Sequence, residues 1–138
     1  MADPLSIAAS AIGTISAIGK TTIAVISFIR EVRGARNDLT RVSGELTSLQ
    51  MTLEQLHDDC NNAECVIPAH IEDNLVAAIQ GCEKTVKNME SLLSRHREGG
   101  LARNVQWSLS SKAEMEALRS NLEAHKLSVN MALNMIQM

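Results

Sequence analysis

The chain has 138 residues and a formal net charge of −3, and 45% of its residues are hydrophobic while 21% are charged. This length suits one domain with its own core and is short for two. With Phe28 and Trp107 as the only aromatic residues and no excess of positive charge, the composition disfavours nucleic acid as a partner, because both base stacking and phosphate attraction are lacking.

A long apolar helix is predicted from about residue 3 to residue 33. Asp3 followed by Pro4 is typical of a helix start, because Asp can accept hydrogen bonds from the free N–H groups and proline loses none at the first position. From Leu5 to Ile29 the only charged residue is Lys20. At about 1.5 Å rise per residue, this stretch is long enough to cross the hydrocarbon core of a membrane.

The large aliphatic residues of this helix gather on one side when residues are placed at steps of about 100°. That side carries Leu5, Ile7, Ile12, Ile15, Ile18, Ile23, Val25, Ile26 and Ile29. Small and polar residues lie opposite: Ser6, Ser10, Gly13, Thr14, Ser16, Lys20, Thr21 and Ser27. Thr22 and Phe28 violate the division. A permanent span does not need such sorting, so the helix is interpreted either as a core helix or as a docked helix that can convert to a membrane helix.

The segment "GTISAIGKTT" ends like a nucleotide-binding phosphate loop. Such a loop needs four residues between its two glycines and a strand before them, because backbone N–H groups must curl around a phosphate. Gly13 and Gly19 are separated by five residues, and the preceding sequence predicts a helix. The pattern therefore does not indicate a nucleotide site before Lys20.

Four arginines follow the apolar helix: Arg30, Arg33, Arg36 and Arg41. Basic residues beside an apolar helix attract anionic lipid, by about 1 kcal/mol per charge near the surface. The alternative is a solvated turn with positive charge near a helix C-terminus. Both interpretations stay open at this point.

Three more helices are predicted, at about 37–60, 68–97 and 110–137. Leu39, Val42, Leu46, Leu49, Leu53 and Leu56 alternate steps of three and four, the heptad seam of a packed helix. The same period places Ile71, Leu75, Ile79, Cys82, Val86, Met89 and Leu93 in the third helix, and Met115, Leu118, Leu122, His125, Val129, Leu133 and Ile136 in the last.

Trp107 is expected to seal a bundle end, and Ser111 with Glu114 to form a capping box. The predicted fold is an all-α, antiparallel bundle of about four long helices in a single domain.

Chemical motifs are weak in this sequence. His57, Cys60, Cys65 and His70 have the spacing of no known zinc finger, so no metal site is predicted, and the two cysteines are interpreted as a helix end and its loop. The sequence shows no recognisable pattern of a nucleophile, a base and an acid that orients the base. His125 is expected in the core and His96 at the surface. We expect no enzyme activity and no cofactor, in an intracellular, reducing setting.

The two ends of the chain resemble a known family. "MADPLSIAASAIG" with Gly19 and Lys20, and "WSLSSKAEMEALRSNLEAHKLSVNMALNMI", are similar to the HeLo-like N-terminal domain of fungal STAND (NLR-like) receptors. The resemblance covers nearly the whole chain, though its middle matches only by helical pattern. It implies a helical bundle related to the HeLo domains of heterokaryon incompatibility proteins and to the executioner bundle of necroptosis.

The resemblance also implies a function, programmed cell death by membrane permeabilisation. Oligomerisation through a receptor or an amyloid-templating module, absent from this chain, would release the first helix from a cytoplasmic bundle into the plasma membrane. Asp3 and the Leu5 to Ile29 helix would then be the membrane-active element, Arg30, Arg33, Arg36 and Arg41 would contact anionic lipids, and copies of the chain would self-associate. On this view the chain is a fragment or an isolated domain. The rival hypothesis is an interaction adaptor that uses the heptad seam or the Met-rich end, Met131, Met135 and Met138, to bind other helices without membrane activity.

Overall fold

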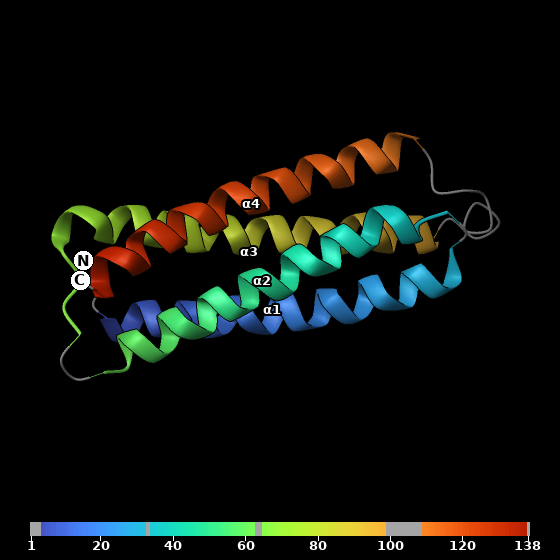
Figure 1. Cartoon of the computed structure of the whole chain (residues 1–138). Helices are drawn as coiled ribbons and strands as arrows, with labels where there is room; N and C mark the ends of the chain where they lie inside the picture. The colour runs from blue at the N-terminus through green and yellow to red at the C-terminus, as the bar shows by residue number, and fades with distance from the viewer. Residues whose placement is uncertain (1–3, 33, 63–64, 99–108, 138) are drawn as a thin grey trace.

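The chain folds into four helices packed along one long axis (Figure 1). The computed structural model describes residues 4–32, 34–62, 65–98 and 109–137. Within these ranges the regular elements are α1 (Pro4–Glu31), α2 (Arg36–Cys60), α3 (Ala69–Glu98) and α4 (Leu109–Gln137). Each helix runs antiparallel to the one before it, which confirms the predicted all-α bundle. The predicted ends of α2 and α4 coincide with the observed ones, and the other predicted bounds differ by one or two residues.

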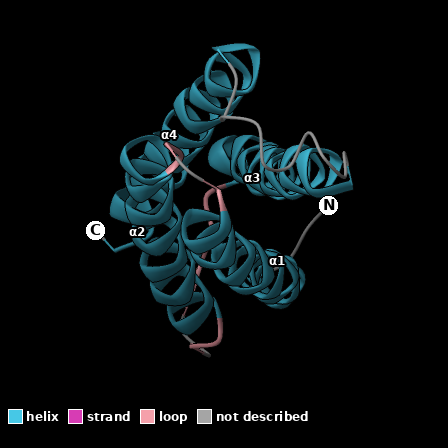
Figure 2. Cartoon of the chain, turned by 90° about the vertical axis from the view of Figure 1, so that its right-hand side faces the viewer, coloured by secondary structure: helices cyan, strands magenta, loops and turns pink. Residues whose placement is uncertain are grey.

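Each helix has two neighbours and one helix diagonally opposite, as the end-on view shows (Figure 2). Helix α1 packs against α2 and α3, and α4 packs against the same two helices. In the described parts, the backbones of α1 and α4 do not come close to one another, and neither do those of the diagonal helices α2 and α3. The molecule is thus two helical hairpins, α1 with α2 and α3 with α4, laid side by side.

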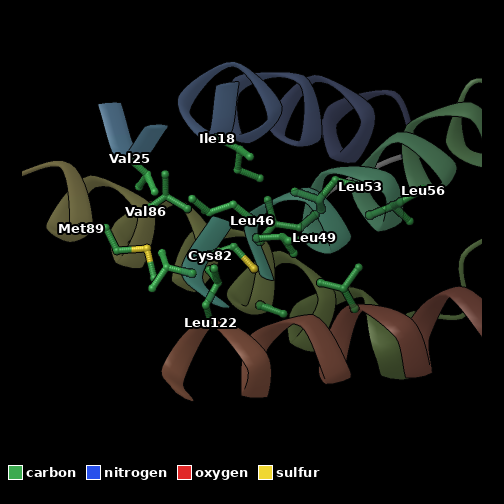
Figure 3. Packing of buried hydrophobic residues seen from close by; sticks show 14 of the residues in the cluster. Ile18, Val25, Leu46, Leu49, Leu53, Leu56, Cys82, Val86, Met89 and Leu122 are labelled. Atoms are coloured by element: carbon green, nitrogen blue, oxygen red, sulfur yellow. The ribbon is translucent and has the colours of Figure 1, made fainter. Parts of the chain in front are cut away.

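The core lies between the four helices and is aliphatic (Figure 3). Every predicted seam residue of α2 is buried, from Leu39 through Leu46, Leu49 and Leu53 to Leu56, which confirms the heptad prediction. The predicted seam of α3 is buried as well. Burying one such leucine side chain is worth about 1.5 to 3 kcal/mol, so these two helices supply most of the stabilising apolar contact.

The seam of α4 is thinner. Met115, Leu122, Val129 and Leu133 are buried, whereas Leu118, His125 and Ile136 are only half-buried. The expected capping box is wrong, because α4 begins at Leu109 and a capping residue must precede the helix. Ser111 lies inside the first turn, and Glu114 pairs with Arg95 of α3 at 2.9 Å instead. Trp107, expected to seal the bundle end, lies outside the described residues.

The α1–α2 connection is short and depends on one glycine. The chain leaves α1 at Glu31 and enters α2 at Arg36. Gly34 has φ of +85°, a left-handed conformation that glycine adopts without the steric cost that a Cβ brings. This conformation turns the chain back so that α2 lies antiparallel against α1.

Two glycine substitutions should have opposite effects on stability. We expect Gly34→Ala to lower the free energy of unfolding by about 1 to 2 kcal/mol, because alanine is strained at positive φ. Gly44 lies exposed in α2, where an added Cβ would meet no heavy atom within 4 Å, so Gly44→Ala should raise it by about 0.5 to 1 kcal/mol. Urea unfolding followed by circular dichroism measures both. A stabilising Gly34→Ala would show that the turn is not left-handed.

Candidate functional site

Helix α1 buries a seam that is poor in large apolar side chains. Its buried residues are Ile7, Ala8, Ala11, Thr14, Ile18, Thr21, Val25 and Phe28. They are spaced by three or four residues along most of the helix, as packing against α2 and α3 requires. Half of them are alanine or threonine, so α1 gains less from burial per residue than α2 does.

Four large aliphatic residues of α1 are exposed instead. Leu5 is 67% exposed, Ile12 50%, Ile23 69% and Ile26 42%. At about 100° per residue they fall within about 60° of one another, on one side of the helix. We call these four residues the exposed ridge. Leaving such a side chain in water forgoes about 1.5 to 3 kcal/mol, so a ridge of four calls for an explanation.

The division of α1 into an apolar and a polar side, expected from the sequence, is therefore wrong in part. Thr14 and Thr21, placed on the polar side, are fully buried, and Phe28, placed as an exception, belongs to the seam. The reason is geometric. The aliphatic residues cover about half of the helix circumference, and the two neighbouring helices cover only one edge of that half together with the threonines beside it.

The two buried threonines differ in how their hydroxyl groups are satisfied. The Oγ1 of Thr14 donates a hydrogen bond to the carbonyl oxygen of Ser10 at 3.2 Å. The Oγ1 of Thr21 is buried and has no hydrogen-bond partner among the described residues. A buried hydroxyl without a partner costs about 1 to 3 kcal/mol, so the seam of α1 contains a locally unfavourable group near its middle.

The glycines of α1 are not required by packing inside the bundle. A Cβ added at Gly13 or Gly19 would meet no heavy atom within 4 Å among the described residues. Both lie within the helix and not in a loop, and Gly19 directly precedes the exposed Lys20. A phosphate-binding loop is thereby excluded at this segment, in agreement with the spacing argument.

The described arginines at the end of α1 and in α2 do not form one basic patch. Arg30, in the last turn of α1, and Arg36 are exposed, and Arg33 lies outside the described residues. Arg41 faces α4, where hydrogen bonds from Arg119 hold the pKa of Glu116 below its usual value and the charge of Arg41 adds to the effect. Arg41 and Glu116 also line a shallow depression with Asp38. Of the three described residues expected to contact lipid, Arg41 lies beside α4, and Arg30 and Arg36 are the other two.

Ion pairs help to hold α4, whose apolar seam is thin. Lys126 lies 2.8 Å from a carboxylate oxygen of Glu45 and donates to the hydroxyl of Ser48 at 3.2 Å, and both charged side chains are mostly buried. Lys112 lies 3.6 Å from Asp38. These contacts join α4 to α2, and partly buried pairs of this kind fix the relative position of two helices.

A groove of about 490 Å³ lies between α3 and α4 on the outside of the bundle. Apolar residues line most of it, including the exposed Met131 and Met135. The ring of His125 lies over Gly81, so close that a Cβ there would be 2.5 Å from the ring. His125 is thus half-buried at a groove and not enclosed in the core as expected. Its ring occupies the space that the absent side chain of Gly81 leaves. Met131 and Met135 do not fill the core, and Met138 lies outside the described residues.

Two further histidines, His96 and His57, have structural contacts, whereas His70 is exposed and lines the groove. His96, expected at the surface, is half-buried with its ring edge-on to Phe28 at 5.2 Å between centroids, which links α3 to the end of α1. His57 lies 3.5 Å from Asp58 and 3.0 Å from Asn61. Among the described residues no three His, Cys, Asp or Glu side chains are placed to hold a metal ion.

Helix α1 also stands apart by its apolar composition. Of the helices in the described ranges, it is the one that is long and apolar enough to cross a membrane. A core helix of a soluble protein can be equally long and apolar, but such a helix is mostly buried. In α1, only 28% of the most apolar 18-residue stretch is buried. The candidate functional site is therefore α1, with its exposed ridge on one side and its weak seam on the other.

Comparison with known families matches residues 2–138 to the family described as pigment biosynthesis cluster protein PigL N-terminal. The chain belongs to this family. Comparisons with curated proteins and with solved structures gave no match. The match does not name a HeLo-like domain, so that relationship stays a prediction that rests on the residues quoted above.

In this member of the PigL N-terminal family, the two buried threonines allow a matched test of the seam. We expect Thr21→Val to raise the free energy of unfolding by about 1 kcal/mol or more, because it removes a buried hydroxyl that has no partner. Thr14→Val should gain less, because it also removes a hydrogen bond. Urea unfolding of both variants measures the difference. Equal gains would mean that the Thr21 hydroxyl is satisfied in solution.

Proposed function

We propose that this domain targets membranes through α1, which leaves the bundle and inserts its exposed ridge and its seam into the bilayer. The observation that supports this most is the partly reversed packing of α1, which buries Thr14 and Thr21 while Ile12 and Ile23 remain exposed. A helix selected only for the core would be expected to bury the isoleucines. A helix that serves two environments must carry apolar residues on both sides.

The energy balance of α1 taken by itself favours such a transfer. In the bundle the four ridge residues are exposed to water, whereas in a bilayer both the ridge and the seam would contact hydrocarbon. With 28 residues, α1 is about 42 Å long, compared with a hydrocarbon core of about 30 Å. The Thr14 hydroxyl can keep its bond to the backbone of its own helix.

The charges of α1 are compatible with this role. Lys20 is exposed in the bundle, so no buried partner has to be broken when α1 leaves. In a membrane its long stem can reach toward an interface or a water-lined pore. Arg30 and Arg36 follow the apolar stretch and would bind anionic headgroups at the end of the inserted helix.

We infer further that the biological role is cell-death execution in an innate-immunity or incompatibility receptor of fungal type. In this proposal the protein is cytoplasmic at rest and reaches the plasma membrane once oligomerisation releases α1. The signal would come from a receptor or an amyloid-templating module. The support for this finer role is the resemblance of the chain ends to HeLo-like domains, together with the apolar α1.

The alternative function is a non-enzymatic adaptor that binds other helices. The groove between α3 and α4 favours it, because methionine side chains are unbranched and adapt to differently shaped apolar partners. Under this hypothesis α1 stays docked, and the chain self-associates or captures a helix without binding lipid.

The first test uses the exposed ridge. The double variant Ile12→Gln, Ile23→Gln should keep the fold, because both side chains are exposed, and should lose most of the dye release from anionic vesicles that the native chain causes. Met51→Gln, an equally exposed apolar position on α2, is the matched control and should release dye like the native chain. Circular dichroism verifies folding in each case.

The proposal would be contradicted if the folded native chain released no dye from anionic vesicles, even when it was forcibly oligomerised. A stable dimer in sedimentation without lipid binding would then favour the adaptor. A loss of dye release in Met51→Gln as large as in the double variant would assign the effect to general surface hydrophobicity and not to α1.

A second test separates insertion of α1 from adsorption of the intact bundle. Thr21→Val strengthens the docking of α1 and makes the helix no less apolar, so we expect slower dye release at unchanged vesicle composition. If the ridge only adsorbed to the surface while α1 stayed docked, Thr21→Val would release dye at the native rate. Stopped-flow fluorescence of a vesicle-enclosed dye measures this rate.

A further inference from the structure

Two of the three cysteines lie together at the end of α2. Cys60 is the last residue of α2 and is buried, and Cys65 is half-buried in the connection to α3. The Cys65 thiol lies close enough to Cys60 to contribute to the raised pKa of the Cys60 thiol. The backbone N–H of Cys65 donates to the carbonyl oxygen of Asn62 at 2.9 Å, which turns the chain back, and Cys65 packs against the same core cluster that contains Cys60.

The position of this pair in the fold is special. The segment from Asn61 to Pro68 is the only covalent connection between the α1–α2 hairpin and the α3–α4 hairpin. Any separation of the hairpins must turn about this connection. A bond between Cys60 and Cys65 would tie the connection to the end of α2 and leave a shorter segment without a cross-link between the two hairpins.

We propose that Cys60 and Cys65 are a dithiol site, which a low-molecular-weight disulfide oxidises reversibly to an intramolecular disulfide. This inference does not depend on the membrane activity of α1. It identifies a modification site on the connection between the two hairpins. The third cysteine, Cys82, is fully buried in the core on α3 and takes no part.

The reaction proceeds by two thiol–disulfide exchanges. The Cys65 thiolate attacks one sulfur of the oxidant, here glutathione disulfide, and releases one glutathione thiolate, so that Cys65 carries a mixed disulfide. The Cys60 thiolate then attacks the Cys65 sulfur and displaces the second glutathione. In total, two protein thiols are oxidised to one disulfide, two glutathione thiols form from one disulfide, and the two protons pass to the glutathione thiolates.

The order of these steps follows from access and acidity. Cys65 is the more accessible of the two, and an external oxidant cannot reach the buried Cys60. Burial raises the pKa of Cys60 to about 12, and the neighbouring Cys65 thiol adds to the rise. Since the thiolate is the attacking species, closure of the disulfide is the slow step at neutral pH and should speed up about tenfold per pH unit.

The experiment treats the full chain with glutathione disulfide at neutral and at mildly alkaline pH and follows the intact mass. We expect the native chain to pass through a species with one added glutathione and to end with the loss of two hydrogens, faster at the higher pH. Cys60→Ala should stop with one glutathione on Cys65, and Cys65→Ser should remain unmodified. Cys82→Ala, which leaves the pair intact, should behave like the native chain.

Peptide mapping after proteolysis would locate the disulfide, and circular dichroism would verify that each variant is folded. The proposal would be overturned if the native chain stopped with one glutathione on Cys65, as Cys60→Ala does. It would also be overturned if the chain gave only disulfide-linked dimers. Should Cys60→Ala fail to fold, the native chain alone decides, because loss of two hydrogens with a mapped Cys60–Cys65 peptide has no other source.

Discussion

The structure depends on the fact that each helix of a four-helix bundle has only two neighbours. For α2 and α3 this is no difficulty, because each carries one narrow aliphatic seam that the two neighbours can cover. Helix α1 carries large aliphatic residues over about half of its circumference, which is more than two neighbours can cover. Some of them must therefore face water, and the exposed ridge of Leu5, Ile12, Ile23 and Ile26 is the result.

The same constraint decides what the sequence could predict. The seams of α2 and α3 were predictable residue by residue, since at these positions the only apolar stripe and the buried stripe must coincide. In α1 the pattern indicated an apolar half but could not tell which edge of it meets the neighbours, because that depends on the tertiary placement of α2 and α3. The burial of Thr14 and Thr21 was missed for this reason. The proximity of Cys60 and Cys65 could likewise not be predicted from the sequence, because it depends on the path of the connecting segment.

Unequal packing divides the four helices into two pairs. The diagonal helices α2 and α3 provide the leucine-rich and aliphatic seams that meet in the centre (Figure 3). The other diagonal pair, α1 and α4, has weaker seams for different reasons: α1 uses alanine and threonine, and α4 is thin and is held to α2 partly by Lys126 with Glu45. Each of these two helices also displays apolar residues outward, the ridge of α1 and the methionines of α4.

This division has a consequence for the proposed release of α1. When α1 leaves, the residues of α2 and α3 that it covered, among them Leu46 and Val86 (Figure 3), become exposed to water. Re-exposing several fully buried aliphatic side chains costs about 1.5 to 3 kcal/mol each, and insertion of α1 into a bilayer does nothing to cover them. A second copy of the chain in the same state presents the same uncovered surface and can bury it against its own. Under the proposed release, membrane insertion of α1 and self-association of the remaining helices would therefore be energetically coupled. A lone chain would be held in the closed bundle, whereas an oligomer would not.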